Sequence, residues 1–179
     1  MTLSIFSSNM ELTYKHTEIY DWVGDEELRT SITKSINEIE KSKTLLRKNN
    51  YEPVISEILG WKDKRERHKD AELHDGTGIE VKKNSSTSFI LDAVRYAEMY
   101  YGACDNGIHL FINFKSGKIH QINRIMIVPN WMVVRMLIPD QDMADSALTM
   151  YNKRKEMDQG LNCQALLNVT RMINKFNNM

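Results

Sequence analysis

The chain has 179 residues, 41% of them hydrophobic and 27% charged, and its 24 basic and 24 acidic side chains cancel. This length suffices for one domain with a buried core, and the composition excludes both a disordered chain and, because no apolar run is long enough to span a bilayer, a membrane protein. The start of the chain lacks a basic-then-apolar export signal, and Cys104 and Cys163 have no metal-ligand spacing, so we expect a cytoplasmic protein with free thiols.

A helix is predicted over Asp21–Asn50. Asp25 can cap its start, because a short acidic side chain accepts hydrogen bonds from the free amides of the first turn. Apolar residues then recur close to helical period, among them Leu28, Ile32 and Ile36. This apolar stripe allows two interpretations: the helix packs on its own domain, or it pairs with the same helix of a second copy across a dimer axis.

A shorter helix is predicted over Val54–Leu59, because Pro53 suits the first helical position and Gly60 can end it. Glu57 lies on this helix. Two interpretations are open for it: a solvated surface carboxylate, or an additional acidic group that leans into a site formed by the segments that follow.

The next segment, Trp61–Lys69, is locally basic, although the zero net charge of the chain provides no global basic field. Its cations outnumber Asp63 and Glu66, and they are Lys62, Lys64, Arg65, Arg67 and Lys69. A run of this kind is typical of a solvated face. Its position immediately before Asp70 also suits contacts with phosphate groups.

The segment Lys69–Lys83 is predicted to form a β-hairpin. Its centre contains Asp75 and Gly76, and an Asp-Gly pair favours a tight turn because both positions tolerate positive φ. The second strand is expected over Gly78–Lys83. The hairpin is the stretch around which we expect the function of the chain to be organised.

This hairpin can bring two carboxylates together. Strand alternation places Glu80 and Lys82 on one face, and the turn can return Asp70 to a position beside Glu80. Two adjacent carboxylates repel each other unless a cation lies between them. A hard divalent ion with oxygen ligands, above all Mg²⁺, would relieve that repulsion.

The rest of the chain reads as alternating elements of both kinds. A polar stretch, Asn84–Ser88, precedes a helix predicted over Phe89–Tyr101, and Ser86 or Ser88 can cap that helix. Strands are then predicted over Gly107–Lys115 and Lys118–Val128, the second with a bulge, and helices over Trp131–Leu137, Asp140–Met157 and Leu161–Phe176. This order indicates an α/β (α+β) fold, a mixed sheet flanked by helices, with extra N- and C-terminal helices.

An acidic residue before a turn and E-x-K on the next strand resemble the PD-(D/E)XK nuclease superfamily. The spacing from Asp70-Ala71 across eight residues to Glu80-Val81-Lys82 is most similar to the PvuII-like type II restriction endonucleases, as is the downstream HLFINFKSGKIHQINRI. The proline of the motif is replaced by the residue before Asp70, a lysine. The resemblance covers about residues 61–128. It implies a restriction-endonuclease-like fold in a single nuclease domain over 1–179, with N-terminal helices at 21–60, a catalytic core at 61–128 and C-terminal helices at 129–179.

The resemblance also implies metal-dependent hydrolysis of phosphodiesters. Asp70 and Glu80 would bind Mg²⁺, with Mn²⁺ as a substitute, and the carbonyl of Val81 would be a further ligand. Lys82 would orient the attacking water and offset the charge that builds on the phosphorane. Glu57 would be an additional acidic catalytic residue.

Double-stranded DNA is the partner that this resemblance implies. The basic run and Lys83 would hold flanking phosphates, while His68 and His74 would contact DNA, shuttle a proton or be ordinary surface histidines. Base edges would be read by the polar side chains of Asn84, Ser85, Ser86, Thr87 and Ser88. A homodimer is expected because protein symmetry mirrors a palindromic site. The predicted helix over Asp25–Asn50 is the first candidate interface and the C-terminal helix is the second.

Two alternatives stand beside a restriction endonuclease. One is a structure-selective nuclease, such as a junction resolvase or a repair enzyme, although the zero net charge favours a sequence-specific enzyme. The other is a non-enzymatic helical interaction module in which Asp70, Glu80 and Lys82 form a surface salt-bridge set. Mg²⁺-dependent loss of supercoiled plasmid separates the nucleases from the module.

Overall fold

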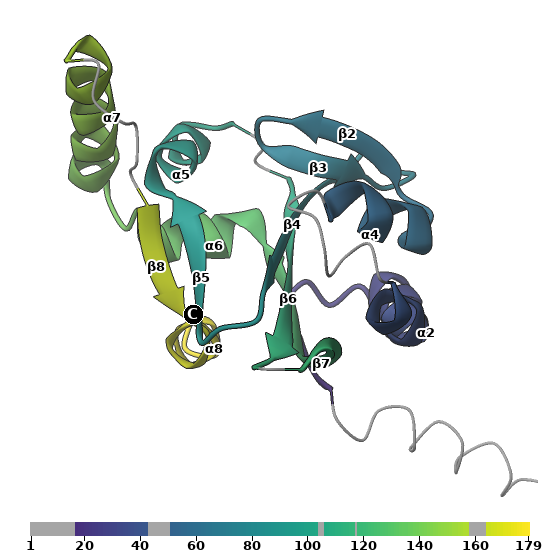
Figure 1. Ribbon diagram of the computed structural model, residues 1–179. Coiled ribbons are helices and arrows are strands. Elements are labelled where there is room, and N and C mark those ends of the chain that lie inside the picture. The colour runs from purple at the N-terminus through teal and green to yellow at the C-terminus, as the bar shows by residue number, and fades with distance from the viewer. Residues whose placement is uncertain (1–16, 43–50, 104–105, 117, 158–163) are drawn as a thin grey trace, which may run out of the picture.

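The computed structural model describes residues 17–42, 51–103, 106–116, 118–157 and 164–179. Within these ranges, strands and helices are intermixed along the chain (Figure 1). The elements are β1 (Glu18–Asp21), α2 (Glu26–Lys41), α4 (Glu52–Leu59), β2 (Lys62–Glu66), β3 (Lys69–Glu72), β4 (Gly78–Asn84), β5 (Ser88–Asp92), α5 (Ala93–Tyr100), β6 (Ile108–Lys115), β7 (Lys118–Pro129), α6 (Asn130–Leu137), α7 (Gln141–Glu156), β8 (Gln164–Asn168) and α8 (Val169–Phe176).

The main sheet has six strands in the order β1-β7-β6-β4-β3-β2. Its centre is the parallel pair β4–β6, and β1 also runs parallel to β7, while β2–β3, β3–β4 and β6–β7 are antiparallel. A second, two-stranded sheet pairs β5 with β8. The predicted α/β class, with a mixed sheet flanked by helices and further helices at both ends, is confirmed.

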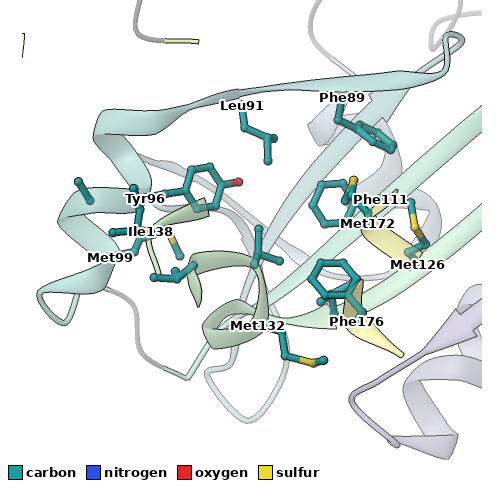
Figure 2. Packing of buried hydrophobic residues seen from close by; sticks show 14 of the residues in the cluster. Phe89, Leu91, Tyr96, Met99, Phe111, Met126, Met132, Ile138, Met172 and Phe176 are labelled. Carbon is teal, nitrogen blue, oxygen red and sulfur yellow. The ribbon is translucent and has the colours of Figure 1, made fainter. Parts of the chain in front are cut away.

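Helices cover both faces of the main sheet (Figure 1). On one face, α2 and α4 pack on alternate residues of β4, β6 and β7 and form what we call the α2-side cluster. On the other face, β5 and α5 to α8 bury an aromatic and methionine-rich α5-side cluster (Figure 2), which includes Phe89, Phe111, Met126, Met172 and Phe176. No helix in the described ranges is both long and apolar enough to cross a membrane.

Helix α2 is the described part of the long helix predicted over Asp21–Asn50. Asp25 is its N-cap as expected, with the carboxylate accepting from the Leu28 amide, and the helix runs to Lys41. Its apolar residues are buried in the α2-side cluster, namely Leu28, Ile32, Ile36 and Ile39. The stripe therefore packs on its own domain, which leaves no apolar face of α2 for the predicted dimer interface. Residues 43–50 of the predicted helix lie outside the described residues.

Two predicted helices contain strands instead. Ser88–Asp92 forms β5, so the helix that was predicted from Phe89 begins only at Ala93, and its N-cap is Asp92 rather than Ser86 or Ser88. Likewise, Gln164–Asn168 forms β8 before α8 begins. The reason is tertiary. These two segments pair with each other across more than 70 residues of chain, with Ile90 opposite Leu166, and pairing of this kind leaves no local signal.

The strands β6 and β7 agree with the prediction and carry the expected irregularity. The register of the β6–β7 ladder shifts on either side of Phe114.

The helix predicted over Asp140–Met157 corresponds to α7, which Asp140 caps. The apolar side of α8, the second candidate for the dimer interface, is buried through Val169, Met172 and Phe176.

We expect Asp92→Ala to lower the free energy of unfolding by about 1 kcal/mol, because the Val94 amide loses its side-chain acceptor. Ser86→Ala, at the other predicted cap position, should change it by less than about 0.5 kcal/mol, because this residue is exposed. Denaturant unfolding of the two variants measures both values. A larger loss in Ser86→Ala would contradict the assignment of the cap.

Candidate active site

The predicted hairpin is present as β3, a tight turn and β4. The turn is closed by hydrogen bonds from the Leu73 amide to the Thr77 carbonyl and from the Gly76 amide to the Leu73 carbonyl. Gly76 has a φ of +90°, which a residue with a side chain rarely adopts. Asp75 accepts from the Thr77 amide at 2.9 Å, which stabilises the turn from within.

The register of the hairpin places Asp70 opposite Glu80. Ala71 pairs with Ile79, and both are fully buried in the α2-side cluster. Strand alternation therefore directs Asp70, Glu80 and Lys82 to the opposite face, toward α5. The Asp70 carboxylate also accepts from the backbone amide of Val81 at 2.7 Å, so the two strands are joined at the site itself.

Glu80 is the most deeply buried charge of the site, with only 1% of the residue exposed. Its Oε1 accepts from Lys82 Nζ at 2.5 Å and also from Nη1 of Arg95, on α5. Its Oε2 is buried and has no hydrogen-bond partner among the described residues. A buried carboxylate oxygen without a partner is costly, so this atom is available to a ligand.

The surroundings shift the pKa values of the two carboxylates in opposite directions. Burial, and then the neighbouring Glu80 carboxylate, raise the pKa of Asp70 to about 7. Burial acts to raise the pKa of Glu80 as well, but Lys82 and Arg95 outweigh it and hold that pKa below its usual value. Near neutral pH, Glu80 is therefore ionised, while Asp70 keeps its proton to a higher pH than an ordinary aspartate does.

A hard divalent cation fits this pair. Carboxylate oxygens are the ligands that Mg²⁺ prefers, and the Oε2 atom of Glu80, which has no partner among the described side chains and backbone, can serve as one. The Val81 carbonyl, predicted as a further ligand, accepts from the Tyr51 hydroxyl at 3.4 Å. No three His, Cys, Asp or Glu side chains gather closely enough to hold a metal within the described ranges. A cation here would therefore take most of its remaining ligands from water.

The acidic residue of α4 that acts on the site is Glu52 rather than Glu57. Glu57 is exposed. Burial and the Glu80 carboxylate are the main causes that raise the pKa of Asp70, and the charge of Glu52, in the first turn of α4, makes a small further contribution in the same direction. Five residues turn a helix by about 500°, so the two side chains point roughly 140° apart. The buried face of Ile55 and Leu59 lies next to Glu52 and nearly opposite Glu57. The helical repeat sets the angle between Glu52 and Glu57, but the sequence does not show which face of α4 is turned toward the site.

The predicted basic run does not form an open basic patch. Lys64 and Lys69 lie 3.3 and 2.9 Å from Glu72, and Arg65 lies 2.8 Å from Asp63. Arg67 binds both oxygens of Glu98, on α5, at 2.7 Å. Acidic partners thus neutralise four of the five cations, and Lys62 stays exposed at the start of β2.

Neither predicted histidine lies against the carboxylate pair. His68 Nε2 is 3.2 Å from Glu98, and burial lowers the pKa of His68. His74 lines a separate hollow of about 330 Å³ beside α2, together with Asp25 and Trp61.

The polar residues predicted to read bases divide into two groups. Asn84 works internally: its side chain donates to the Ser88 carbonyl and accepts from Asn113, both at 2.6 Å. Ser85, Ser86 and Thr87 are exposed at the tip of the loop. They line a hollow of about 160 Å³ whose other polar residues include Asn113, Asn123 and Asn168. Lys83 lies on the other side of β4, with its ammonium 4.9 Å from the centroid of the Tyr51 ring.

Sequence reasoning missed two supports of the site, Arg95 and His109. His109 pairs with Glu80 in the β4–β6 register and is fully buried, and its ring contacts the Tyr96 hydroxyl at 2.8 Å and Asn130 Oδ1 at 2.6 Å. Burial lowers its pKa to about 4, so the ring is neutral. A histidine at an inward position of an otherwise apolar strand was the available signal.

No protein-family model and no curated protein sequence matches this chain.

The raised pKa of Asp70 predicts how stability depends on pH. Between its unfolded value near 4 and about 7, the folded protein binds more protons than the unfolded chain, so stability falls as pH rises through this window. In EDTA at pH 8, Asp70→Asn should therefore increase the free energy of unfolding by about 2–4 kcal/mol, and the gain should disappear near pH 4.

Asp75→Asn, in the turn of the same hairpin, is the matched control. The Thr77 amide holds the pKa of Asp75 below its usual value, so removal of that charge should not stabilise the protein at pH 8. Thermal and denaturant unfolding across pH measure both variants. A destabilised Asp70→Asn at pH 8 without metal would show that the Asp70 carboxylate is not under electrostatic strain.

Proposed function

We propose that this protein is a Mg²⁺-dependent type II restriction endonuclease that acts in the cytoplasm and hydrolyses double-stranded DNA at a specific short sequence. The observation that carries the proposal is the adjacent pair Asp70 and Glu80, with Lys82 bound to one oxygen of Glu80. The other oxygen is buried and meets no hydrogen-bond partner within the described ranges. The proposal rests on the chemistry of this pair together with the sequence resemblance to the PD-(D/E)XK nucleases.

The burial of the pair argues against a surface salt-bridge set. Exposed ion pairs contribute little and leave the pKa values of their members near normal. Here Glu80 is almost completely removed from water and the pKa of Asp70 is raised to about 7. Strained, buried ionisable groups of this kind are typical of functional sites, so a reactive centre is favoured over an interaction module.

Each residue has a role in phosphodiester hydrolysis. Asp70 and Glu80 would hold the cation. The Val81 carbonyl, which accepts from the Tyr51 hydroxyl, would be a further ligand. A bound divalent cation lowers the pKa of a coordinated water and neutralises phosphate charge. Lys82, held at Glu80 by its ion pair, would orient the attacking water and donate to the phosphate oxygen on which charge develops.

Sequence specificity is the second part of the proposal. The neutralised basic run leaves few cations for indiscriminate binding to phosphates, which favours recognition through base edges over a structure-selective enzyme. Ser85, Ser86 and Thr87 follow β4 directly and are exposed. The Ser86 hydroxyl is bonded to Ser88, so the hydroxyls of Ser85 and Thr87 are the more suitable donors and acceptors for base edges. A palindromic site would require a homodimer that presents two such loops.

Lys82→Ala should reduce Mg²⁺-dependent cleavage by at least about 100-fold while leaving DNA binding nearly unchanged, because it removes a donor to the reacting phosphate but no metal ligand. Lys153→Ala, on α7, is the matched control and should cleave like the wild type. The assay is digestion of a long defined DNA, with Asp70→Ala as the inactive reference. Full activity of Lys82→Ala would contradict the assignment. Cleavage confined to branched DNA would favour a resolvase, and no cleavage by the wild type would favour the interaction module.

Thr87→Ala should reduce cleavage at the cognate sequence by about tenfold, with little change in binding to unrelated DNA, because base contacts discriminate and phosphate contacts do not. Thr33→Ala, on α2, is the control, since its hydroxyl bonds within the helix at Arg29. Cleavage at a defined site and competition with unrelated DNA measure the two effects. Equal losses in both would assign Thr87 to backbone contact.

A further inference from the structure

Arg95 reaches the buried carboxylate from a separate element. It lies in the first turn of α5, between Val94 and Tyr96, which are buried and hold the helix against the sheet. Its Nη1 donates to Glu80 Oε1, and its side chain keeps 27% of its surface exposed. Its Nε is buried and has no hydrogen-bond partner among the described residues.

The ion pair between Arg95 and Glu80 differs from the pair between Arg67 and Glu98, which also has one member on α5. Arg67 and Glu98 form a bidentate pair, in which Nε and Nη2 of the arginine each donate to one carboxylate oxygen at 2.7 Å. At Glu80, two cations share Oε1, while neither Oε2 nor Arg95 Nε has a hydrogen-bond partner in the part of the chain that the structure describes. An ion pair with only a structural role would satisfy these groups, as Arg67 and Glu98 do.

The two cations also line one cavity. Lys82 and Arg95 face a hollow of about 190 Å³, which is bordered by Asp92, Tyr96 and Gln164. A water molecule takes about 30 Å³ of liquid volume, so this space accommodates several waters or one phosphate group. A guanidinium suits a phosphate because its planar fork presents two parallel donors to two oxygens.

A divalent cation at Glu80 would change the balance of charge. Lys82 and Arg95 together carry two positive charges, and one carboxylate currently serves both of them. If the cation takes that carboxylate as a ligand, the two side chains are left with an unneutralised charge beside the cavity. A phosphodiester, which is an anion, supplies what they then lack.

We propose that Arg95 is a phosphate-binding residue that exchanges partners: it holds Glu80 while no divalent cation is bound, and it donates to non-bridging oxygens of a nucleic-acid phosphate once Glu80 binds the cation. This inference rests on the proposed function, because it takes Glu80 as a metal ligand. It assigns to α5 the task of coupling metal binding to substrate binding.

The exchange predicts effects of opposite sign from one substitution. In Arg95→Gln, Mn²⁺ no longer competes with the Arg95 guanidinium for the charge of the Glu80 carboxylate, so Mn²⁺ should bind roughly fivefold more tightly or better. The Mg²⁺-loaded variant should bind inorganic phosphate about tenfold more weakly, because two charge-assisted donors are lost. Arg95→Lys keeps the charge without the fork, so its Mn²⁺ affinity should be close to that of the wild type and its phosphate affinity intermediate.

The measurements are a Mn²⁺ titration followed by electron paramagnetic resonance and calorimetry of inorganic phosphate with Mg²⁺-loaded protein. Arg29→Gln, an exposed arginine on α2, is the matched control and should behave as the wild type in both. Circular dichroism melting confirms that each variant is folded. If Arg95→Gln does not fold, Arg95→Lys carries the test alone, and phosphate affinity equal to that of the wild type overturns the proposal.

The possible failures are distinguishable. Weaker Mn²⁺ binding in Arg95→Gln would make Arg95 a support for Glu80 and overturn the exchange. Unchanged Mn²⁺ and phosphate binding in Arg95→Gln, with Mn²⁺ binding lost in Asp70→Ala, would overturn the role of Arg95 and leave the metal centre standing. Unchanged Mn²⁺ binding in Asp70→Ala would overturn the proposed function itself and the exchange with it.

Discussion

The burial of the Glu80 carboxylate is the constraint on which the rest of the site depends. A carboxylate removed from water is tolerated only where positive charge or donors replace its hydration. Lys82 supplies charge from the same strand, and Arg95 supplies it from α5, so the position of that helix against β4 is part of the solution. The burial of Asp70 itself, and then the charge of Glu80, raise the pKa of Asp70, and a bound cation would relieve both effects.

The surrounding fold keeps this arrangement rigid. On one side of β4, the α2-side cluster buries Ile79 and Val81, which sets the face that Glu80 must take. Behind Glu80, the neutral His109 joins Tyr96 of α5 to Asn130 of α6. Gly107, just before β6, leaves room for this network, because a Cβ there would lie 2.1 Å from the Asn130 side-chain nitrogen. Two helices and two strands are thereby held to one geometry.

Local interactions explain which parts of the structure were predictable. The hairpin follows from Asp75-Gly76 and from strand alternation, and both operate between neighbours in sequence. The facing of Glu80 and Lys82 follows from the same alternation. By contrast, β5 and β8 were predicted as helices, because what makes them strands is their pairing with each other. The basic run was predicted to contact phosphates because the sequence does not show its acidic partners. Glu98, which binds Arg67, lies about thirty residues away on α5.

The sequence by itself therefore determined the hairpin, the adjacency of Asp70 and Glu80 and the face that Lys82 shares with Glu80. Strand periodicity and turn preferences depend only on residues that are close together in the sequence. Only the tertiary structure decided that Arg95 donates to Glu80 and that the charge of Glu52, rather than that of Glu57, contributes to the pKa of Asp70. It also decided that the apolar stripe of α2 packs inside the domain. These are matters of how one element is rotated and placed against another. Such placement depends on the packing of all the elements together, and no short stretch of the chain encodes it.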